Sequence, residues 1–530
     1  MLNFLLPSVC LSLLNVEINF PQHHSTTHEG SVGKVNFPIS STEAGQKQFD
    51  HALAMLHHMM YDHAEKEFKA LVDTDPNCSM AHWGIAMSSF HPLWHEPNKE
   101  DLQKGSEAVQ KALKINPPTK KEQDYISAIG EFYKSWEIVN HATRLSNWVS
   151  AQEKLYKTYP EDVDAGAFYA LSLIASAPKE DKEFKNQKTA GKLLAKLHKQ
   201  APEHPGLFHY IIHAYDNPML AKDAVDVARG YDKLAPDVPH ALHMPSHIFV
   251  RLGLWDDAID WNIRSAASAK KNSLGEIVSL HYPHALDYLM YSYLQKAEDK
   301  LAEETLSKVN APENYEDNLA SAYGIAASQA RYVLERKQWK EAAELPVRTH
   351  SAFPWDKYPF AEAITYFTRG LGAARIDNVA AAKDALKKLD ELHKNTLDKG
   401  QNYWATLVDA QRITVNAWTA YSEGKKDEAL KLMKKAADLE DSVDKHPVTP
   451  GAVLPARELL GDMLILLNKH VDALAAYETS LKISPNRFYS INGAGYAAKL
   501  AGDSDKENYF YTALNQLTAD ADSERPDLDR

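Results

Sequence analysis

Residues 190–202 read AGKLLAKLHKQAP, and residues 224–236 read AVDVARGYDKLAP. Both stretches begin with Ala, have a second apolar residue four positions later and end with Pro, and the two Pro residues are 34 positions apart. The same spacing recurs at residues 64–76 and 473–485. A small residue suits a close crossing of two helices, and Pro ends a helix because it lacks a backbone N–H. The spacing therefore predicts a repeated pair of helices.

The text outside these stretches supports the same fold. Gly253 to Ala258 has a turn glycine followed by a small residue five positions later, and Gly424 to Ala429 has the same pattern. Glycine is only 22 of 530 residues, well below the usual share of about 7%. A 34-residue helix–turn–helix period is that of tetratricopeptide repeats. We expect an all-α protein, a tetratricopeptide-type superhelix (α-solenoid) of about nine to eleven helix pairs between Ser41 and Leu517.

Composition excludes several classes of function. Lys and Arg number 59 and Asp and Glu 72, which gives a net charge of −13 and disfavours nucleic acid as a partner. The two cysteines, Cys10 and Cys78, are too few for a disulfide framework or a cysteine-based zinc ribbon. The unusual count is 24 histidines.

The chain starts with an apolar segment, Met1 to Val16. It is shorter than the roughly 20 residues that a membrane span needs, and no other run is long enough for a transmembrane helix. It is similar to the hydrophobic part of a secretory signal, although no basic residue precedes Lys34. We expect export to the periplasm or the outside of the cell, or a cytoplasmic protein if the segment is not a signal.

We expect five regions along the chain. They are a signal-like leader with a His-rich linker (1–40), amino-terminal helical repeats (41–200), central His-rich repeats (201–310), carboxy-terminal helical repeats (311–517) and an acidic tail (518–530).

Many central histidines fall in register. Pro205, Pro239 and Pro283 are each expected to start a first helix of a pair, since Pro is favoured at the first helical position. Residues one, four and eight places after each Pro share a helix face. They are Gly206, His209 and His213, then His240, His243 and His247, then His284, Asp287 and Tyr291. In tetratricopeptide repeats this face lines the concave groove, so six histidines and a carboxylate are expected in one patch.

This patch has the chemistry of a metal site. Imidazoles four residues apart on a helix, as in His209/His213 and His243/His247, can chelate one divalent ion. The expected ligands are His209, His213, His240, His243, His247, His284 and Asp287. Imidazole with a carboxylate suits Zn, Cu, Ni or Fe(II). Asp216, one turn beyond His213, is a candidate partner that orients an imidazole.

Pro245 works against the simple one-face arrangement. It lies inside the helix drawn from Pro239, where it should kink or restart the helix and separate His243 from His247. The histidines could also be a polar ladder that bonds to backbone carbonyls.

The rest of the groove is expected to include His57, Tyr210, Arg251 and Tyr291, facing a peptide, protein or small molecule. Asp287 and Asp216 are weak candidates for a general base. The spacing His209-x-x-x-His213 is that of zinc proteases, but Tyr210 stands where their catalytic Glu would be.

Residues 78–87, 240–255 and 284–289 resemble a family of large bacterial tetratricopeptide-repeat proteins, and the resemblance runs from about Val35 to Leu517. Members typically carry a signal peptide and a His-rich start, so the resemblance implies the repeat fold and export. It implies no activity.

Three functions stay open. The first is an exported scaffold that binds a ligand in its groove through a His-coordinated transition metal. The second is a metal-dependent hydrolase or oxidoreductase that uses the same site. The third is an adaptor that binds proteins or peptides without metal.

Overall fold

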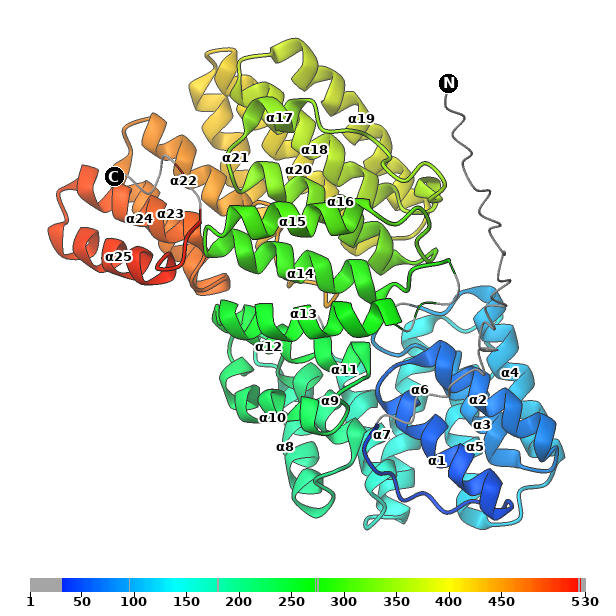
Figure 1. Ribbon diagram of the computed structural model, residues 1–530. Helices are drawn as coiled ribbons and strands as arrows, with labels where there is room; N and C mark the ends of the chain where they lie inside the picture. Colours follow the sequence, from blue (N-terminus) through cyan, green and yellow to red (C-terminus); the bar gives the residue numbers. More distant parts are fainter. Residues whose placement is uncertain are drawn as a thin grey trace, which may run out of the picture.

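The computed structural model describes residues 31–94, 96–178, 181–271, 273, 276–522 and 525. In these ranges the regular structure is helical, apart from one isolated β-bridge between Val278 and Tyr315. The signal-like leader and the histidines at positions 23, 24 and 28 lie outside the described residues. Successive helices stack as hairpins along a curved array, as Figure 1 shows.

The bounds of the helices follow the chain in three stretches. The first contains α1 Glu43–His57, α2 Tyr61–Thr74, α3 Ser79–Ser88, α4 Lys99–Lys114, α5 Lys120–Tyr133, α6 His141–Thr158, α7 Val163–Ala175 and α8 Lys185–Gln200. The second contains α9 Pro205–Tyr215, η1 Ala221–Ala224, α10 Val225–Gly230, η2 Tyr231–Lys233, α11 Pro239–His243, α12 Pro245–Leu252, α13 Trp255–Lys271, α14 His281–Gln295 and α15 Asp299–Asn310. The third contains α16 Leu319–Leu334, α17 Trp339–Ala343, η3 Trp355–Lys357, α18 Pro359–Arg375, α19 Val379–Asp398, α20 Asn402–Ser422, α21 Lys426–Glu440, α22 Ala456–Leu466, α23 His470–Ile483, α24 Phe488–Ala501 and α25 Ser504–Leu517.

The prediction of an all-α helical-repeat fold is confirmed. If α11 and α12 are taken as one broken helix, the described residues contain twelve helix pairs, from α1/α2 to α24/α25, where nine to eleven were expected. The array curves back on itself, because α1 also contacts α9 and α14 also contacts α24. Within the described residues, each helix is too short or too polar to cross a lipid bilayer.

Glycines lie opposite aromatic side chains where some of the helices cross. A Cβ atom on Gly84 of α3 would lie 2.4 Å from the buried ring of Phe68 in α2. A Cβ atom on Gly461 of α22 would lie 2.6 Å from the ring of Tyr477 in α23. Gly461 lets the two helices of one pair approach closely, and Gly84 does the same for helices of consecutive pairs, so that an aromatic ring fills each crossing.

We expect Gly84→Ala to destabilise the protein. The added methyl group must displace the buried Phe68 ring, at a cost of about 1–3 kcal/mol that exceeds the gain of about 1 kcal/mol in helix propensity. The measurement is the free energy of unfolding in urea. Gly130→Ala in α5 is the matched control, since its Cβ would meet only Val109 at 3.4 Å, and it should be neutral or slightly stabilising. Equal effects of the two variants would contradict the packing argument.

The central helices start close to the predicted positions. Pro205 starts α9 and Pro239 starts α11, but α14 begins at His281, two residues before Pro283. The expected break at Pro245 is present: α11 ends at His243 and α12 begins at Pro245. The helical direction is nevertheless kept, because Met244 between them has α-helical dihedral angles.

A long connection covers the first helices of the central pairs. We call residues 441–455, between α21 and α22, the inner loop. Tyr288 of α14 donates a hydrogen bond from its hydroxyl to the carbonyls of Pro447 (2.9 Å) and Thr449 (3.1 Å). The inner loop is therefore fixed on the face that the sequence predicted to be an open groove.

Both described ends of the chain are held by contacts. Residues 31–40 were expected to be part of a linker, but Phe37 is buried, and the backbone N–H of Lys34 donates to the carbonyl of Glu203 at 2.8 Å. In the acidic tail, Arg525 is buried and forms an ion pair with Asp299. Residues 523–524 and 526–530 of that tail lie outside the described residues.

Candidate metal centre

Six central histidines meet beside the inner loop. His209 and His213 come from α9, His240 and His243 from α11, His247 from α12 and His284 from α14. They form two groups of three, and within each group one ring nitrogen per residue lies within 4.8 Å of the others. We call His209, His213 and His240 the first triad, and His243, His247 and His284 the second triad.

The first triad joins two consecutive repeat units. Nδ1 of His209 lies 2.7 Å from the carbonyl oxygen of His57, so it must carry the proton and donate. Nε2 of His209 then faces Nε2 of His213 at 3.1 Å. The ring centroid of His240 lies 5.0 Å from that of His209. In the described part of the chain, neither ring nitrogen of His240 has a hydrogen-bond partner.

In the second triad, too, the Nε2 atoms of two imidazoles face each other and a third ring lies beside them. Nδ1 of His243 lies 2.9 Å from Oδ1 of Asn262, and Nδ1 of His247 lies 2.9 Å from Oδ2 of Asp216. The two Nε2 atoms face each other at 3.2 Å. The ring centroid of His284 lies 4.1 Å from that of His243.

The orientation of Asn262 fixes the proton on His243. The amide nitrogen of Asn262 donates to Oγ of Ser246 and to the carbonyl of Ala258, both at 2.7 Å. Its oxygen is therefore the atom that faces His243, and Nδ1 of His243 is the donor. Because Asp216 is ionised, Nδ1 of His247 is also a donor. Both Nε2 atoms of this pair then present lone pairs to each other.

Two facing lone pairs repel unless a proton or a metal ion lies between them. Burial holds the pKa of His243 well below the usual value, so an additional proton between His243 and His247 is disfavoured. In the first triad, neutral His213 can carry its one proton on Nε2 and donate it to Nε2 of His209. In a tetrahedral Zn site with bonds near 2.0 Å, ligand nitrogens lie about 3.3 Å apart. The separations of 3.1 and 3.2 Å are close to this value.

The hydrogen-bond acceptors around these imidazoles are of the kind found around metal-binding histidines. A metal-binding His usually donates its other ring N–H to a carbonyl, amide or carboxylate, which fixes its tautomer. His57, Asn262 and Asp216 accept such bonds. Asp216 thus orients an imidazole as anticipated, although the imidazole is that of His247, on the next unit, and not that of His213.

Asp216 belongs to a buried group of charges. Its Oδ1 accepts from Nε of Arg251 at 2.8 Å, and Lys445 of the inner loop lies 3.2 Å away. Although burial opposes ionisation, Lys445 and Arg251 hold the pKa of Asp216 well below its usual range. Burial lowers the pKa of Lys445 to about 8. Arg251 also pairs with Asp444, so two cations balance two carboxylates.

A small cavity adjoins both triads. Its accessible volume is about 50 Å³, enough for a few water molecules. Its walls are His213, His240, His247 and His284, the apolar side chains of Leu93, Trp94, Leu280, Leu319, Ala320, Pro447 and Val448, and two further polar residues, Asn318 and His446. The cavity is therefore mostly apolar apart from the imidazoles.

Asp287 belongs to neither triad. Its Oδ1 accepts from Nε of Arg331 at 2.8 Å, and both side chains are fully buried. Burial raises the pKa of Asp287 to about 6, against the opposing charge of Arg331. The structure thus brings together the six predicted histidine ligands and places the predicted carboxylate ligand in an ion pair.

The residues predicted to line an open groove are buried. The hydroxyl of Tyr210 lies 3.0 Å from Nδ1 of His57. Arg251 makes the ion pairs given above, and the hydroxyl of Tyr291 accepts from Arg487 at 2.9 Å. None of His57, Tyr210, Arg251 and Tyr291 is more than 4% exposed, so these side chains hold elements together and do not face a free concave surface.

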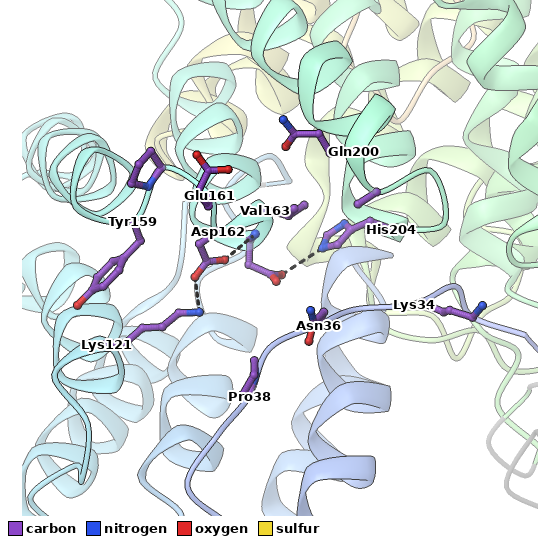
Figure 2. A pocket seen from close by; sticks show the side chains of 13 residues that line it. Lys34, Asn36, Pro38, Lys121, Tyr159, Glu161, Asp162, Val163, Gln200 and His204 are labelled. Carbon is purple, nitrogen blue, oxygen red and sulfur yellow. Dashed lines mark hydrogen bonds and ion pairs between the residues drawn. The ribbon is translucent and has the colours of Figure 1, made fainter.

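A third group of ligand-type residues lies apart from the triads, beside a larger hollow. Oδ1 of Asp164 lies 2.8 Å from Nε2 of His57 and 3.2 Å from Nε2 of His204. The hollow has a volume of about 630 Å³, and Asp164 is one of the residues that line it. Figure 2 shows His204 at its wall, with Lys121 paired to Asp162. Both imidazoles contact the same carboxylate oxygen through Nε2, which ties α1, α7 and the start of α9 together.

Sequence reasoning missed several neighbours of the triads. Asn262 lies on α13, a second helix of its pair, whereas only first helices were searched. His281 lies one turn before His284, and its ring is 5.3 Å from that of His240. A predicted helix start at residue 281, in place of Pro283, would have added His281 to the candidate ligands. Nothing in the local spacing pointed to Lys445 or the inner loop.

The fold and the site define a helical-repeat protein with a buried cluster of histidines. No protein-family model matches the chain, and no curated protein matches it. Among solved structures, the chain is similar to an IFIT1 monomeric mutant with Gppp-AAAA, at 12% identity and a TM-score of 0.38, covering 82% of this chain and 90% of that one. It is also similar to the human IFIT1 dimer with m7Gppp-AAAA (12% identity, TM-score 0.35, 83% and 90% covered) and to yeast Tom70 (12% identity, TM-score 0.29, 92% and 94% covered).

Proposed function

We propose that this protein binds transition-metal ions, one in each histidine triad. The observation that carries the proposal is the 3.2 Å contact between the Nε2 atoms of His243 and His247, which present lone pairs to each other, and the first triad offers the same set of three imidazoles. In His209, His243 and His247 the other ring nitrogen donates to a fixed acceptor, which leaves the Nε2 lone pair for a metal.

The donor set restricts the metal. Each triad offers three imidazole nitrogens and no carboxylate, a set that suits Cu and Zn and does not suit Mg or Ca. Three protein ligands leave a coordination position open, as in catalytic metal sites, and the 50 Å³ cavity adjoins both triads. This favours a site that takes a small ligand over a purely structural one.

Export is also a proposal. It is supported by the apolar segment from Met1 to Val16, which is similar to the hydrophobic part of a secretory signal. Binding of a peptide or protein partner finds less support, because the predicted groove residues are covered.

Metal analysis of the purified full chain tests the proposal. We expect about two ions of Cu or Zn per chain after loading with one metal and dialysis. The double variant His243→Ala/His247→Ala should lose one of them, because it removes two of three ligands from the second triad. His393→Ala, outside both triads, is the control and should keep both ions. Metal-free wild-type protein, or a folded double variant with full metal content, would refute the proposal.

A further inference from the structure

The two triads are neighbours. The ring centroids of His213 and His247 are 5.9 Å apart, and those of His240 and His243 are 6.3 Å apart. Each of these pairs has one member in each triad. Two of the three histidines of each triad also line the same cavity, so ions bound in the triads would share one space for an additional ligand.

The charges around the triads favour ions of low charge. All six candidate ligands are imidazoles, which bind a metal ion only in their neutral form, and neither triad contains a carboxylate. Asp216 is balanced by Arg251 and Lys445, and Asp287 by Arg331. Two divalent ions would therefore leave four positive charges in a buried site, whereas two Cu(I) ions would leave two, at a much smaller cost of desolvation.

The cavity limits what can bind to such a pair. A volume of about 50 Å³ is enough for a diatomic molecule. Its remaining walls are mainly apolar, from Trp94, Leu280 and Val448 among others, which favours a neutral ligand over an anion. Dioxygen has the size and polarity that this space accepts.

From these observations we propose that the two triads form one dinuclear copper(I) centre that binds dioxygen reversibly in the adjoining cavity. The inference rests on the proposed metal sites and adds the metal, its nuclearity and the ligand.

The binding step balances without a further reactant. Each of the two Cu(I) ions gives one electron to dioxygen and becomes Cu(II). The dioxygen molecule accepts two electrons, its O–O bond falls from double to single, and both oxygen atoms stay bound between the ions. No proton is needed, and release of dioxygen returns one electron to each ion.

The test uses the full chain, loaded with Cu(I) without air. We expect two copper ions per chain, binding of carbon monoxide detected by infrared spectroscopy, and uptake of one dioxygen per two copper ions on an oxygen electrode. Lowering the oxygen pressure should release the dioxygen. Two bound copper ions without uptake of carbon monoxide or dioxygen would overturn this inference and leave the proposed function standing, whereas no metal binding would overturn both.

Variants decide whether the ions act as a pair. His213→Ala in the first triad and His284→Ala in the second should each keep one copper ion and lose all dioxygen uptake. Half of the wild-type uptake in either variant would show two independent sites and would contradict the proposal. Far-UV circular dichroism shows whether each variant is folded.

A cavity variant keeps the test valid if the histidine variants misfold. Ala320 is at the cavity wall and is no metal ligand. Ala320→Leu should keep two copper ions and weaken dioxygen binding at least tenfold, because the larger side chain fills the space. Unchanged dioxygen affinity would place the ligand elsewhere and overturn the inference. His393→Ala again serves as the control with wild-type behaviour.

Discussion

Acidification of the metal-free protein from pH 7 to about pH 5 is expected to unfold it. Burial lowers the pKa of His57 to about 4 and the pKa values of His58, His213 and His281 to about 3. The same groups have a pKa near 6.5 in the unfolded chain. At a pH between the folded and the unfolded pKa values, the unfolded chain binds more protons than the folded protein. The stability that is present above pH 6.5 is therefore lost as the pH falls towards 4.

The effect is large because the histidines act together. Each neutral buried imidazole costs about 1.4 kcal/mol of stability per pH unit below 6.5, so these four give about 5 kcal/mol per unit. Total stability is on the order of 5–15 kcal/mol. The measurement is helix content by circular dichroism during acid titration with a chelator present. Unchanged stability between pH 7 and pH 5 would contradict the prediction.

Two variants separate this cause from a general acid effect. His58 is fully buried, with Nδ1 bonded to the hydroxyl of Tyr231 at 2.8 Å. His58→Gln should reduce the proton uptake on unfolding by about one. His51 is the matched control, because its hydrogen bond to Glu67 raises its pKa. Its replacement by Gln should not reduce the proton uptake.

Replacement of Arg331 is expected to have the largest effect of a single substitution on stability. Arg331 donates from Nε to Asp287, from Nη1 to the carbonyl of Ala452 and from Nη2 to the carbonyl of Gly451, each at 2.8 Å. Arg331→Met leaves a buried carboxylate unpaired and the carbonyl of Ala452 without a donor, while the carbonyl of Gly451 keeps the hydroxyl of Thr449. We expect a loss of about 3–5 kcal/mol, measured by urea denaturation.

The same substitution should release the inner loop. Native-state trypsin cleavage after Lys445, whose side chain is only 10% exposed in the fold, would report this release. Asp287→Asn/Arg331→Met should recover part of the stability, because no charge is then left buried. Arg336→Met is the control, since its ion pair with Asp299 is 3.4 Å long and partly exposed, and it should cost under about 1 kcal/mol. Equal losses for the two arginines would refute the argument.

The sequence by itself determined the helical array and the register of the histidines. Both follow from local rules: helix periodicity, a small residue at close crossings such as Ala64, and Pro at helix starts such as Pro205. For the same reason the break at Pro245 was foreseen. The spacing also predicted that His243 and His247 lie together, but whether the break would separate them depends on the dihedral angles of Met244.

Only the tertiary structure decided what surrounds the histidines. Asp287 had the spacing of a ligand, but it pairs with Arg331, 44 positions away. A buried carboxylate is costly unless it is paired, and this pairing decides its position more than the helix face does. Lys445 reaches Asp216 across 229 positions. Such contacts arise from the curvature of the stacked array, which residue spacing along one helix does not encode. The curvature and the inner loop turned an expected open groove into a buried site with a small apolar cavity.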